Sequence, residues 1–289
     1  MKRFGVIGHP IAHSLSPLLH NTAFELLGLE CRYESFDVEP ASLQRAVRDL
    51  LSQGFAGLNV TIPHKEKVVE LVDDLSEEAR FLGAVNTLSS DGNRLRGDNT
   101  DVYGFAATLQ PYTGEIRDHA VLLIGAGGSA RAIVYALVDQ FGPAEIVIAN
   151  RSSERAAELV RDLHPHAKGA TLRSIAAEAR DIDGVIAQAS LIVNATPLGM
   201  SPAVAQSPVS AQTKFQPGQI VMDTIYTPLE TTLLGRARTC GARTISGLEM
   251  FLHQGARSFE IWLDSRMPLD RLRPIILNEL KTRASSSRN

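Results

Sequence analysis

The chain has 289 residues, of which 44% are hydrophobic and 21% charged, the balance of an ordinary globular protein. Its formal net charge of −3 argues against nucleic-acid binding or attraction to a membrane surface as the main function. The two cysteines, Cys31 and Cys240, form no disulfide framework and lack zinc-ligand spacing, so we expect no metal. Without a signal-peptide-like start or a bilayer-spanning apolar run, the chain is expected to be cytoplasmic.

Strand-like segments alternate with amphipathic helical segments from the first residues onward. The helix of the first block that is easiest to identify covers residues 16–29, with Ser16 as N-cap, Pro17 as the first helical residue and Gly28 as the C-terminal stop. Such alternation predicts an α/β fold with mainly parallel sheets. The strands expected in this first block are residues 3–8, 32–38, 57–62 and 83–90.

The first block also carries short polar side chains at or just beyond the ends of its predicted strands. Ligands of open α/β sheets bind outside the carboxyl ends of the strands. Hydroxyls, an amide, a cation and a carboxylate together suit a small polyhydroxylated anion. Each side chain alone also has a structural explanation, such as a helix cap or a partner for buried backbone. The set comprises Ser14, Ser16, Thr61, Lys65, Asn86 and Asp101.

A second block begins near residue 102 and repeats the strand–helix pattern. This recurrence is typical of a doubly wound nucleotide-binding domain. Residues 248–263 then form one long predicted helix. The strands expected in the second block are residues 120–125, 145–150, 191–196, 219–225 and 242–247.

The segment "IGAGGSARA" follows the first strand of this block and opens a helix. Gly125, Gly127 and Ala130 fit the pattern G-x-G-x-x-A, in which glycines allow a tight turn and close approach of a pyrophosphate. The helix N-terminus adds free N–H groups and a partial positive charge. The predicted dinucleotide-binding residues are Gly125, Ala126, Gly127, Gly128, Ser129 and Ala130.

The end of the next strand, "ANRSSERA", indicates which dinucleotide is bound. An NAD domain usually has an acidic residue here, whereas this chain has Asn150, Arg151, Ser152 and Arg155. Guanidinium groups pair bidentately with phosphate, so the segment favours NADP. Ser152 also suits the N-cap of the following helix, a role compatible with cofactor binding, and Glu154 would repel a 2′-phosphate.

Eight segments together resemble the shikimate dehydrogenase family, in that family's order and over nearly the whole chain. They are "GHPIAHSLSPLLHN", "GLNVTIPHKEKV", "GAVNTL", "GDNTDVYGF", "GAGGSARA", "NRSSERA", "NATPLGM" and "GLEMFLHQGARSF". The resemblance implies an NADP-dependent enzyme that reversibly reduces 3-dehydroshikimate to shikimate in aromatic amino-acid biosynthesis. It also implies two α/β domains flanking a cleft: a substrate-binding domain at 1–101, a Rossmann-like NADP domain at 102–247, and helices at 248–289 that return to the first.

The resemblance further implies a role for individual residues. Lys65 and Asp101 match the family's catalytic pair, which handles the proton when hydride reaches the ketone. Positions that line the nicotinamide are matched by Thr196, Thr224 and Gly247. Substrate-binding positions are matched by Ser14, Ser16, Thr61, Asn86, Tyr226 and Gln254.

For Lys65, "GLNVTIPHK" predicts a place in the first turn of a helix that begins at Pro63, near the helix dipole. An ammonium there could stabilise and protonate the alkoxide formed from a ketone. The alternative is a surface lysine paired with Glu66 or Glu70.

Two other functions stay open at this point: a quinate or quinate/shikimate dehydrogenase that uses NAD, and a catalytically silent NADP-binding regulator. The expected partner is a small-molecule substrate, and the chain could be a monomer or a homodimer.

Overall fold

A computed structural model describes residues 1–92 and 94–286 of the chain. It divides into two compact units, one formed by Met1–Gly104 with Leu252–Asn289 and the other by Phe105–Phe251. Both are α/β units, which confirms the predicted fold class. The breaks lie inside helices α4 (Asp101–Leu109) and α10 (Leu248–Leu263), a few residues from the boundaries predicted after residues 101 and 247.

The first unit contains a six-stranded sheet with the order β2-β1-β3-β5-β6-β4. Strands β1, β2 and β3 pair in parallel, as do β4 and β6, whereas β5 is antiparallel to both of its neighbours. The sheet is therefore mainly parallel, with one antiparallel strand that was not predicted. The strands are β1 (Lys2–Gly8), β2 (Cys31–Asp37), β3 (Phe55–Val60), β4 (Asp74–Leu75), β5 (Thr87–Ser90) and β6 (Leu95–Asp98). The remaining helices of this unit are α1 (Ser16–Leu27), α2 (Leu43–Ser52), α3 (Glu77–Leu82) and α11 (Leu269–Ser286).

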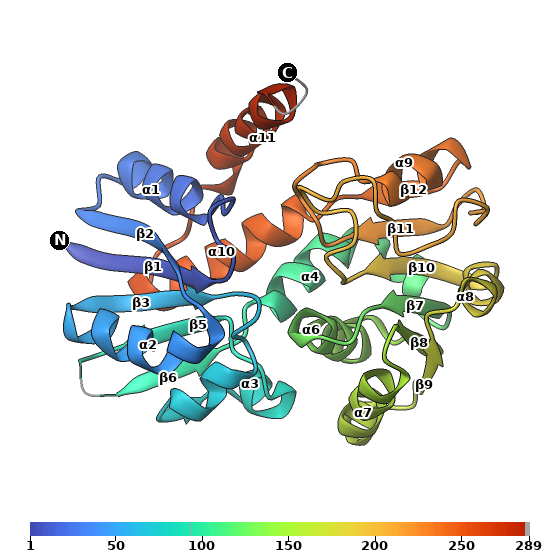
Figure 1. Ribbon diagram of the computed structural model, residues 1–289, viewed down its shortest axis with the longest axis horizontal. Helices are drawn as coiled ribbons and strands as arrows, with labels where there is room; N and C mark the ends of the chain where they lie inside the picture. The colour runs from blue at the N-terminus through green and yellow to red at the C-terminus, as the bar shows by residue number, and fades with distance from the viewer. Residues whose placement is uncertain (93, 287–289) are drawn as a thin grey trace. The chain divides into compact units, whose positions relative to one another are not determined.

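Helices cover both faces of this sheet (Figure 1). On one face, Val47 and Leu50 of α2 pack into the core formed with β3 and β5. On the other face, the Trp262 indole of α10 stacks on Phe4 at 4.9 Å, and its N–H donates to the Leu88 carbonyl at 2.9 Å. These contacts fix helix α10 to the sheet. The sequence alone predicted a helix over the same residues, 248–263.

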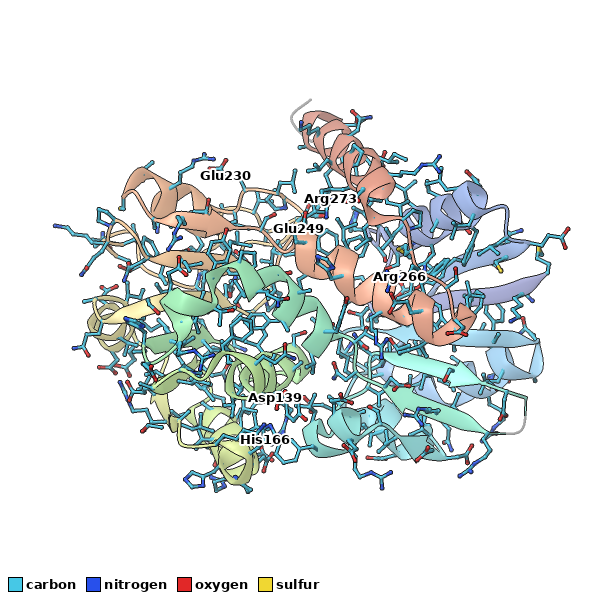
Figure 2. The ribbon with its side chains drawn as sticks, turned by 180° about the vertical axis from the view of Figure 1, so that it is seen from behind. Asp139, His166, Glu230, Glu249, Arg266 and Arg273 are labelled. Atoms are coloured by element: carbon cyan, nitrogen blue, oxygen red, sulfur yellow. The ribbon has the colours of Figure 1, made fainter. Side chains whose placement is uncertain are left out.

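Figure 2 shows Glu249 near the start of α10 and Arg266 in the turn that follows it, before Arg273 on α11. The C-terminal segment therefore folds back onto the same unit as the N-terminal strands. Within the described residues, none of the helices combines the length and apolar character needed to cross a membrane.

The second unit is an entirely parallel sheet with the order β12-β11-β10-β7-β8-β9. The chain order reverses between β7 and β10, which is the switch point of a doubly wound fold. The strands are β7 (Ala120–Ile124), β8 (Glu145–Asn150), β9 (Thr171–Ala176), β10 (Ala189–Asn194), β11 (Ile220–Asp223) and β12 (Arg243–Ile245). The helices, besides part of α4, are α5 (Thr113–Ile116), α6 (Gly128–Ala136), α7 (Ser153–Leu163), α8 (Ala179–Ile186) and α9 (Thr232–Thr239).

The reversal at the switch point places helices on both faces of this sheet (Figure 1). Residues of α8 and α9, such as Ile186 and Leu234, pack with Ile192 and Val221 in one buried cluster. Helices α6 and α7 contact each other on the opposite face. In folds of this type, ligands bind outside the carboxyl edge of the sheet, near the switch point.

Candidate active site

Lys65 and Asp101 form a close ion pair in the first unit. The Lys65 Nζ atom lies 2.6 Å from Asp101 Oδ2, and the two side chains are only 12% and 7% exposed. Asp101 is the first residue of α4. The pairing excludes the alternative in which Lys65 is a surface lysine whose partner is Glu66 or Glu70.

The backbone around Lys65 differs from the prediction. No helix begins at Pro63; Lys65 lies in a turn ahead of the short 3₁₀ helix η2 (Lys67–Leu71). The Lys65 carbonyl accepts a hydrogen bond from Val85 N–H at 2.8 Å, so it is held by a tertiary contact. The helix start expected at Pro63 is therefore absent, and Lys65 is paired with Asp101.

Asn86 fixes the orientation of the Asp101 carboxylate. Its amide nitrogen donates to Asp101 Oδ1 at 2.8 Å, and its side-chain oxygen accepts from the Thr100 backbone N–H at 2.8 Å. A backbone N–H can only donate, so the two ends of the Asn86 amide are unambiguous. Asn86 itself is only 3% exposed, so these contacts hold the carboxylate from the interior.

The hydroxyl-bearing residues lie at the same edge of the sheet as this pair. Thr61 follows β3, and its N–H donates to the Ile7 carbonyl of β1 at 2.9 Å. Asn86 belongs to the same edge because its carbonyl accepts from Val60 N–H at 2.8 Å. Ser14 and Ser16 follow β1, while Gln254 comes from α10. The contacts of Thr61 and Asn86 place these two residues at this edge, and the substrate roles of Ser14, Ser16 and Gln254 remain predictions.

The helix cap at this edge also differs from the prediction. Ser16 is the first residue of α1 rather than its N-cap, and the N-cap position is held by Leu15. The Ser14 hydroxyl instead accepts a hydrogen bond from Ser16 N–H at 3.2 Å. Gly28 ends the helix in a left-handed conformation, as predicted.

In the second unit, the glycine-rich turn lies at the switch point after β7. Gly125 has a φ of 122°, and a Cβ there would lie 3.0 Å from the Ala195 carbonyl oxygen, so glycine is required. A Cβ on Gly127 would meet no protein atom within 4 Å, which leaves room for a ligand to approach the backbone. Gly128 and Ser129 open α6, and Ala130 is fully buried. These features, with Ala126, fit a pyrophosphate-binding turn.

The predicted selector for NADP lies at the end of the neighbouring strand β8. Asn150 is the last residue of this strand, and its amide donates to the Ser152 carbonyl at 2.9 Å. Ser152 is the N-cap of α7 and accepts from Arg155 N–H. Arg151 and Arg155 are exposed. Because β7 and β8 pair in parallel, the segment that carries both arginines begins at the same edge of the sheet as the glycine-rich turn.

The predicted nicotinamide-lining residues follow β10 and β11. Thr196 donates through its N–H and hydroxyl to Asn194 Oδ1, at 3.0 and 2.7 Å. Gly247 lies against Thr224 so closely that a Cβ would stand 2.0 Å from the Thr224 carbonyl oxygen. Tyr226, also beyond β11, packs its ring 4.6 Å from that of Phe251. The roles assigned to these residues remain predictions.

Sequence analysis missed Asp223, a fully buried carboxyl at the end of β11. It accepts hydrogen bonds from Asn194, the Ile225 N–H and Thr231 at 3.0, 3.1 and 2.7 Å. Burial raises the pKa of Asp223 to about 6, and the hydrogen bonds from Thr231, Ile225 and Asn194 oppose that rise. The sequence signal that could have revealed Asp223 is a polar residue at the end of an apolar strand, as in "IVMD".

The raised pKa of Asp223 predicts a pH-dependent stability. Below the unfolded pKa of 3.8 the carboxyl is protonated in both states, and above about 6 it is ionised in both. Its contribution to the free energy of unfolding therefore falls as pH rises through this window, by about 2 kcal/mol between about pH 4.5 and pH 7. Urea unfolding at both pH values should show a fall of this size in the wild type relative to Asp223→Asn. If the free energy of unfolding changed equally with pH in the wild type and in Asp223→Asn, the prediction would be wrong.

The histidines near the first-unit motifs have structural surroundings. His64 Nε2 lies 2.7 Å from the Val38 carbonyl, and His9 Nδ1 lies 2.8 Å from Asp37. His20 is buried and stacked on Tyr33 at 4.3 Å, and burial lowers its pKa to about 3. Within the described part of the chain, no three His, Cys, Asp or Glu side chains form a group that could hold a metal ion.

Comparisons with known proteins agree with this geometry. Three family models match the chain: the shikimate dehydrogenase substrate-binding domain at residues 6–88, shikimate/quinate 5-dehydrogenase at 108–215, and the shikimate 5′-dehydrogenase C-terminal domain at 247–276. The NADP(+) shikimate dehydrogenase of Methanopyrus kandleri is 41% identical, over 96% of this chain and 95% of its own.

Two solved structures are similar over nearly their full length. Shikimate 5-dehydrogenase from Thermus thermophilus, in complex with NADP(H) and shikimate, has a TM-score of 0.81 and 35% identity, covering 98% of this chain and 100% of its own. Quinate dehydrogenase from Corynebacterium glutamicum, in complex with NAD, has a TM-score of 0.86 and 32% identity, covering 96% and 99%. From motifs, fold and full-length similarity alike, this chain belongs to the shikimate dehydrogenase family.

Proposed function

We propose that the chain is an NADP-dependent shikimate dehydrogenase, which reversibly reduces 3-dehydroshikimate to shikimate in aromatic amino-acid biosynthesis. The observation that carries the proposal is the buried pair of Lys65 and Asp101, 2.6 Å apart. Ser14, Ser16 and Thr61 are proposed to act beside it. A cation, a carboxylate and several hydroxyls are the groups that a small hydroxylated carboxylate needs.

In this proposal Lys65 is the acid and base of the reaction. When bound, NADPH supplies a hydride to the ketone carbon of the substrate. The Lys65 ammonium stabilises the negative charge that develops on the ketone oxygen and donates a proton to it. In the reverse direction the neutral amine accepts the hydroxyl proton. Asp101 holds the amine in place and accepts a hydrogen bond from a substrate hydroxyl.

The remaining substrate contacts are proposed from matched positions. Ser14 and Ser16 would bind the carboxylate, and Thr61 and Asn86 would bind ring hydroxyls. Asn86 is adjacent to the pair, since its amide donates to Asp101 Oδ1 at 2.8 Å. Gln254 and Tyr226 complete the proposed set of substrate-binding residues.

The cofactor would be held by the second unit. The turn from Gly125 to Ala130 would bind the pyrophosphate at the start of α6. Asn150, Arg151, Ser152 and Arg155 would surround the 2′-phosphate, and Thr196, Thr224 and Gly247 would line the nicotinamide. We further propose that the enzyme is cytoplasmic and works as a monomer or homodimer.

The test is a steady-state comparison of shikimate and quinate, each with NADP and NAD. We expect turnover of shikimate, with kcat/KM for NADP at least about tenfold above that for NAD, because Arg151 and Arg155 pair with the 2′-phosphate. Loss of NADPH absorbance with 3-dehydroshikimate measures the reverse reaction. Equal efficiency with both cofactors would overturn the role given to the two arginines.

A second candidate, an NAD-dependent quinate dehydrogenase, is favoured by one observation: the quinate enzyme from Corynebacterium glutamicum has a TM-score of 0.86 to this chain. The same four assays decide between the two, since faster turnover of quinate with NAD would replace our proposal. Absence of turnover in all four would leave the silent NADP-binding regulator.

A further inference from the structure

A buried polar network connects the Lys65–Asp101 pair to the C-terminal helix α10. Its central member is Ser258, which is fully buried. The Ser258 hydroxyl lies 2.9 Å from Asn59 Nδ2 and 2.8 Å from Thr87 Oγ1. These residues come from α10, β3 and β5, so the contacts join three elements that are remote in sequence.

Several hydrogen bonds of this network have a fixed direction, because one of the two partners can only donate or only accept. The Tyr33 hydroxyl donates to Asn59 Oδ1 at 2.7 Å, which turns the Asn59 amide nitrogen toward Ser258. The single proton of the Ser258 hydroxyl can go to the Gln254 carbonyl at 3.1 Å or to Thr87 Oγ1 at 2.8 Å. Thr87 in turn donates to Asn86 Oδ1 at 3.0 Å, and neighbouring hydrogen bonds in such a network strengthen one another.

The network ends on the proposed catalytic pair. Asn86 Oδ1 is held by Thr87, and also by the N–H and hydroxyl of Thr100 at 2.8 and 3.1 Å. The opposite end of the Asn86 amide donates to Asp101 Oδ1, while Asp101 Oδ2 binds Lys65 Nζ. Rotation of the Asn86 amide would therefore release one carboxylate oxygen and change where the amine points.

We propose that Ser258 is a positioning residue for the reaction, which acts through Thr87 and Asn86 on Asp101 and Lys65. This inference rests on the proposed dehydrogenase function. Removal of the Ser258 hydroxyl takes one buried partner from the Asn59 amide and one from the Thr87 hydroxyl, which keep their other contacts. The loss of a buried hydrogen bond carries a cost. The network would rearrange, and the rearrangement would reach the amine through Asn86.

The first measurement compares Ser258→Ala with Ser76→Ala. Ser76 is a matched control, a buried hydroxyl of the same unit that caps α3 through Ala79 N–H at 3.1 Å. We expect Ser258→Ala to lower kcat for shikimate roughly tenfold or more, with KM for NADP within about twofold of the wild type. Ser76→Ala should lower the urea midpoint and keep kcat. An unchanged kcat for Ser258→Ala would overturn the inference.

The second measurement repeats the Ser258→Ala change in an Asn86→Ala background. If Ser258 acts through Asn86, the second substitution should lower kcat by less than about twofold there, because the two effects are coupled. A full tenfold drop in this background would overturn the inference. Ser258→Cys keeps a small polar group and should recover part of kcat, and it replaces Ser258→Ala if the latter fails to fold. Wild-type turnover is measured first, since its absence would refute the proposed function instead.

Discussion

Replacing Lys65 with alanine is expected to lower kcat for shikimate oxidation by roughly 10²–10⁴-fold, the usual contribution of an acid–base group. The expectation rests on the 2.6 Å pair with Asp101, which keeps the ammonium at the sheet edge that also carries Thr61 and Ser14. Without the amine, the ketone oxygen would lose both its electrostatic partner and its proton donor. KM for NADP should change little, because the proposed cofactor residues belong to the other unit.

The chain offers a matched control for this experiment two residues away. Lys67 is 77% exposed and pairs with Glu70 at 3.5 Å, so Lys67→Ala removes the same charge without touching the pair. Its kcat should stay within about twofold of the wild type, in keeping with the small energies of exposed ion pairs. A Lys65→Ala enzyme with the kcat of the Lys67→Ala enzyme would remove Lys65 from the chemistry.

The general architecture was accessible from the sequence because its signals are local. Apolar runs such as "AVLLIG" and "EIVIAN" predict buried parallel strands, and both appear as β7 and β8. Gly125 follows the first of these runs, and its φ of 122° is the conformation that glycine permits. The helix over residues 248–263 was likewise visible from its apolar periodicity.

Where prediction failed, a tertiary contact had replaced a local preference. Pro63 suggested a helix start, but the Lys65 carbonyl bonds to Val85 instead of to a helical N–H. Ser16 suggested an N-cap, but the Ser14 hydroxyl accepts the bond from Ser16 N–H. The antiparallel direction of β5 could not be predicted, because it depends on pairing with β3 and β6, and a local sequence pattern does not indicate which strands pair.

The residues of the candidate site also fall into two groups: those with a local sequence signal and those that only tertiary contacts reveal. Lys65 and Asp101 could be named as candidates because each lies at or beyond the end of a predicted strand, and the family resemblance identified them as a pair. Ser258 could not, since a serine within "GARSFEIW" is indistinguishable from a surface serine of an amphipathic helix. Only its contacts with Asn59 and Thr87 reveal its environment. Functional groups at strand ends are therefore easier to find than the buried groups that hold them.

The second large effect is expected for Gly247→Ala, which should lower the free energy of unfolding by roughly 3 kcal/mol or more. The added Cβ would stand 2.0 Å from the Thr224 carbonyl oxygen and 3.0 Å from the Ile225 carbonyl carbon. Both are backbone atoms, so no side-chain rotation can relieve the contact. The Gly247 N–H also donates to the Ile225 carbonyl at 2.9 Å, and the shift needed to admit a methyl group would break that bond.

Gly184→Ala is the control for this substitution, because it adds the same atom in open space. Gly184 lies within α8, is exposed, and would place a Cβ with nothing inside 4 Å. Alanine there should keep or raise the free energy of unfolding, by about 0.5–1 kcal/mol, since glycine is the poorer helix former. Urea titrations of both variants measure the difference. If Gly247→Ala were as stable as Gly184→Ala, the backbone of β11 and the start of α10 would not be in close contact, and the placement of Thr224 beside Gly247 would be wrong.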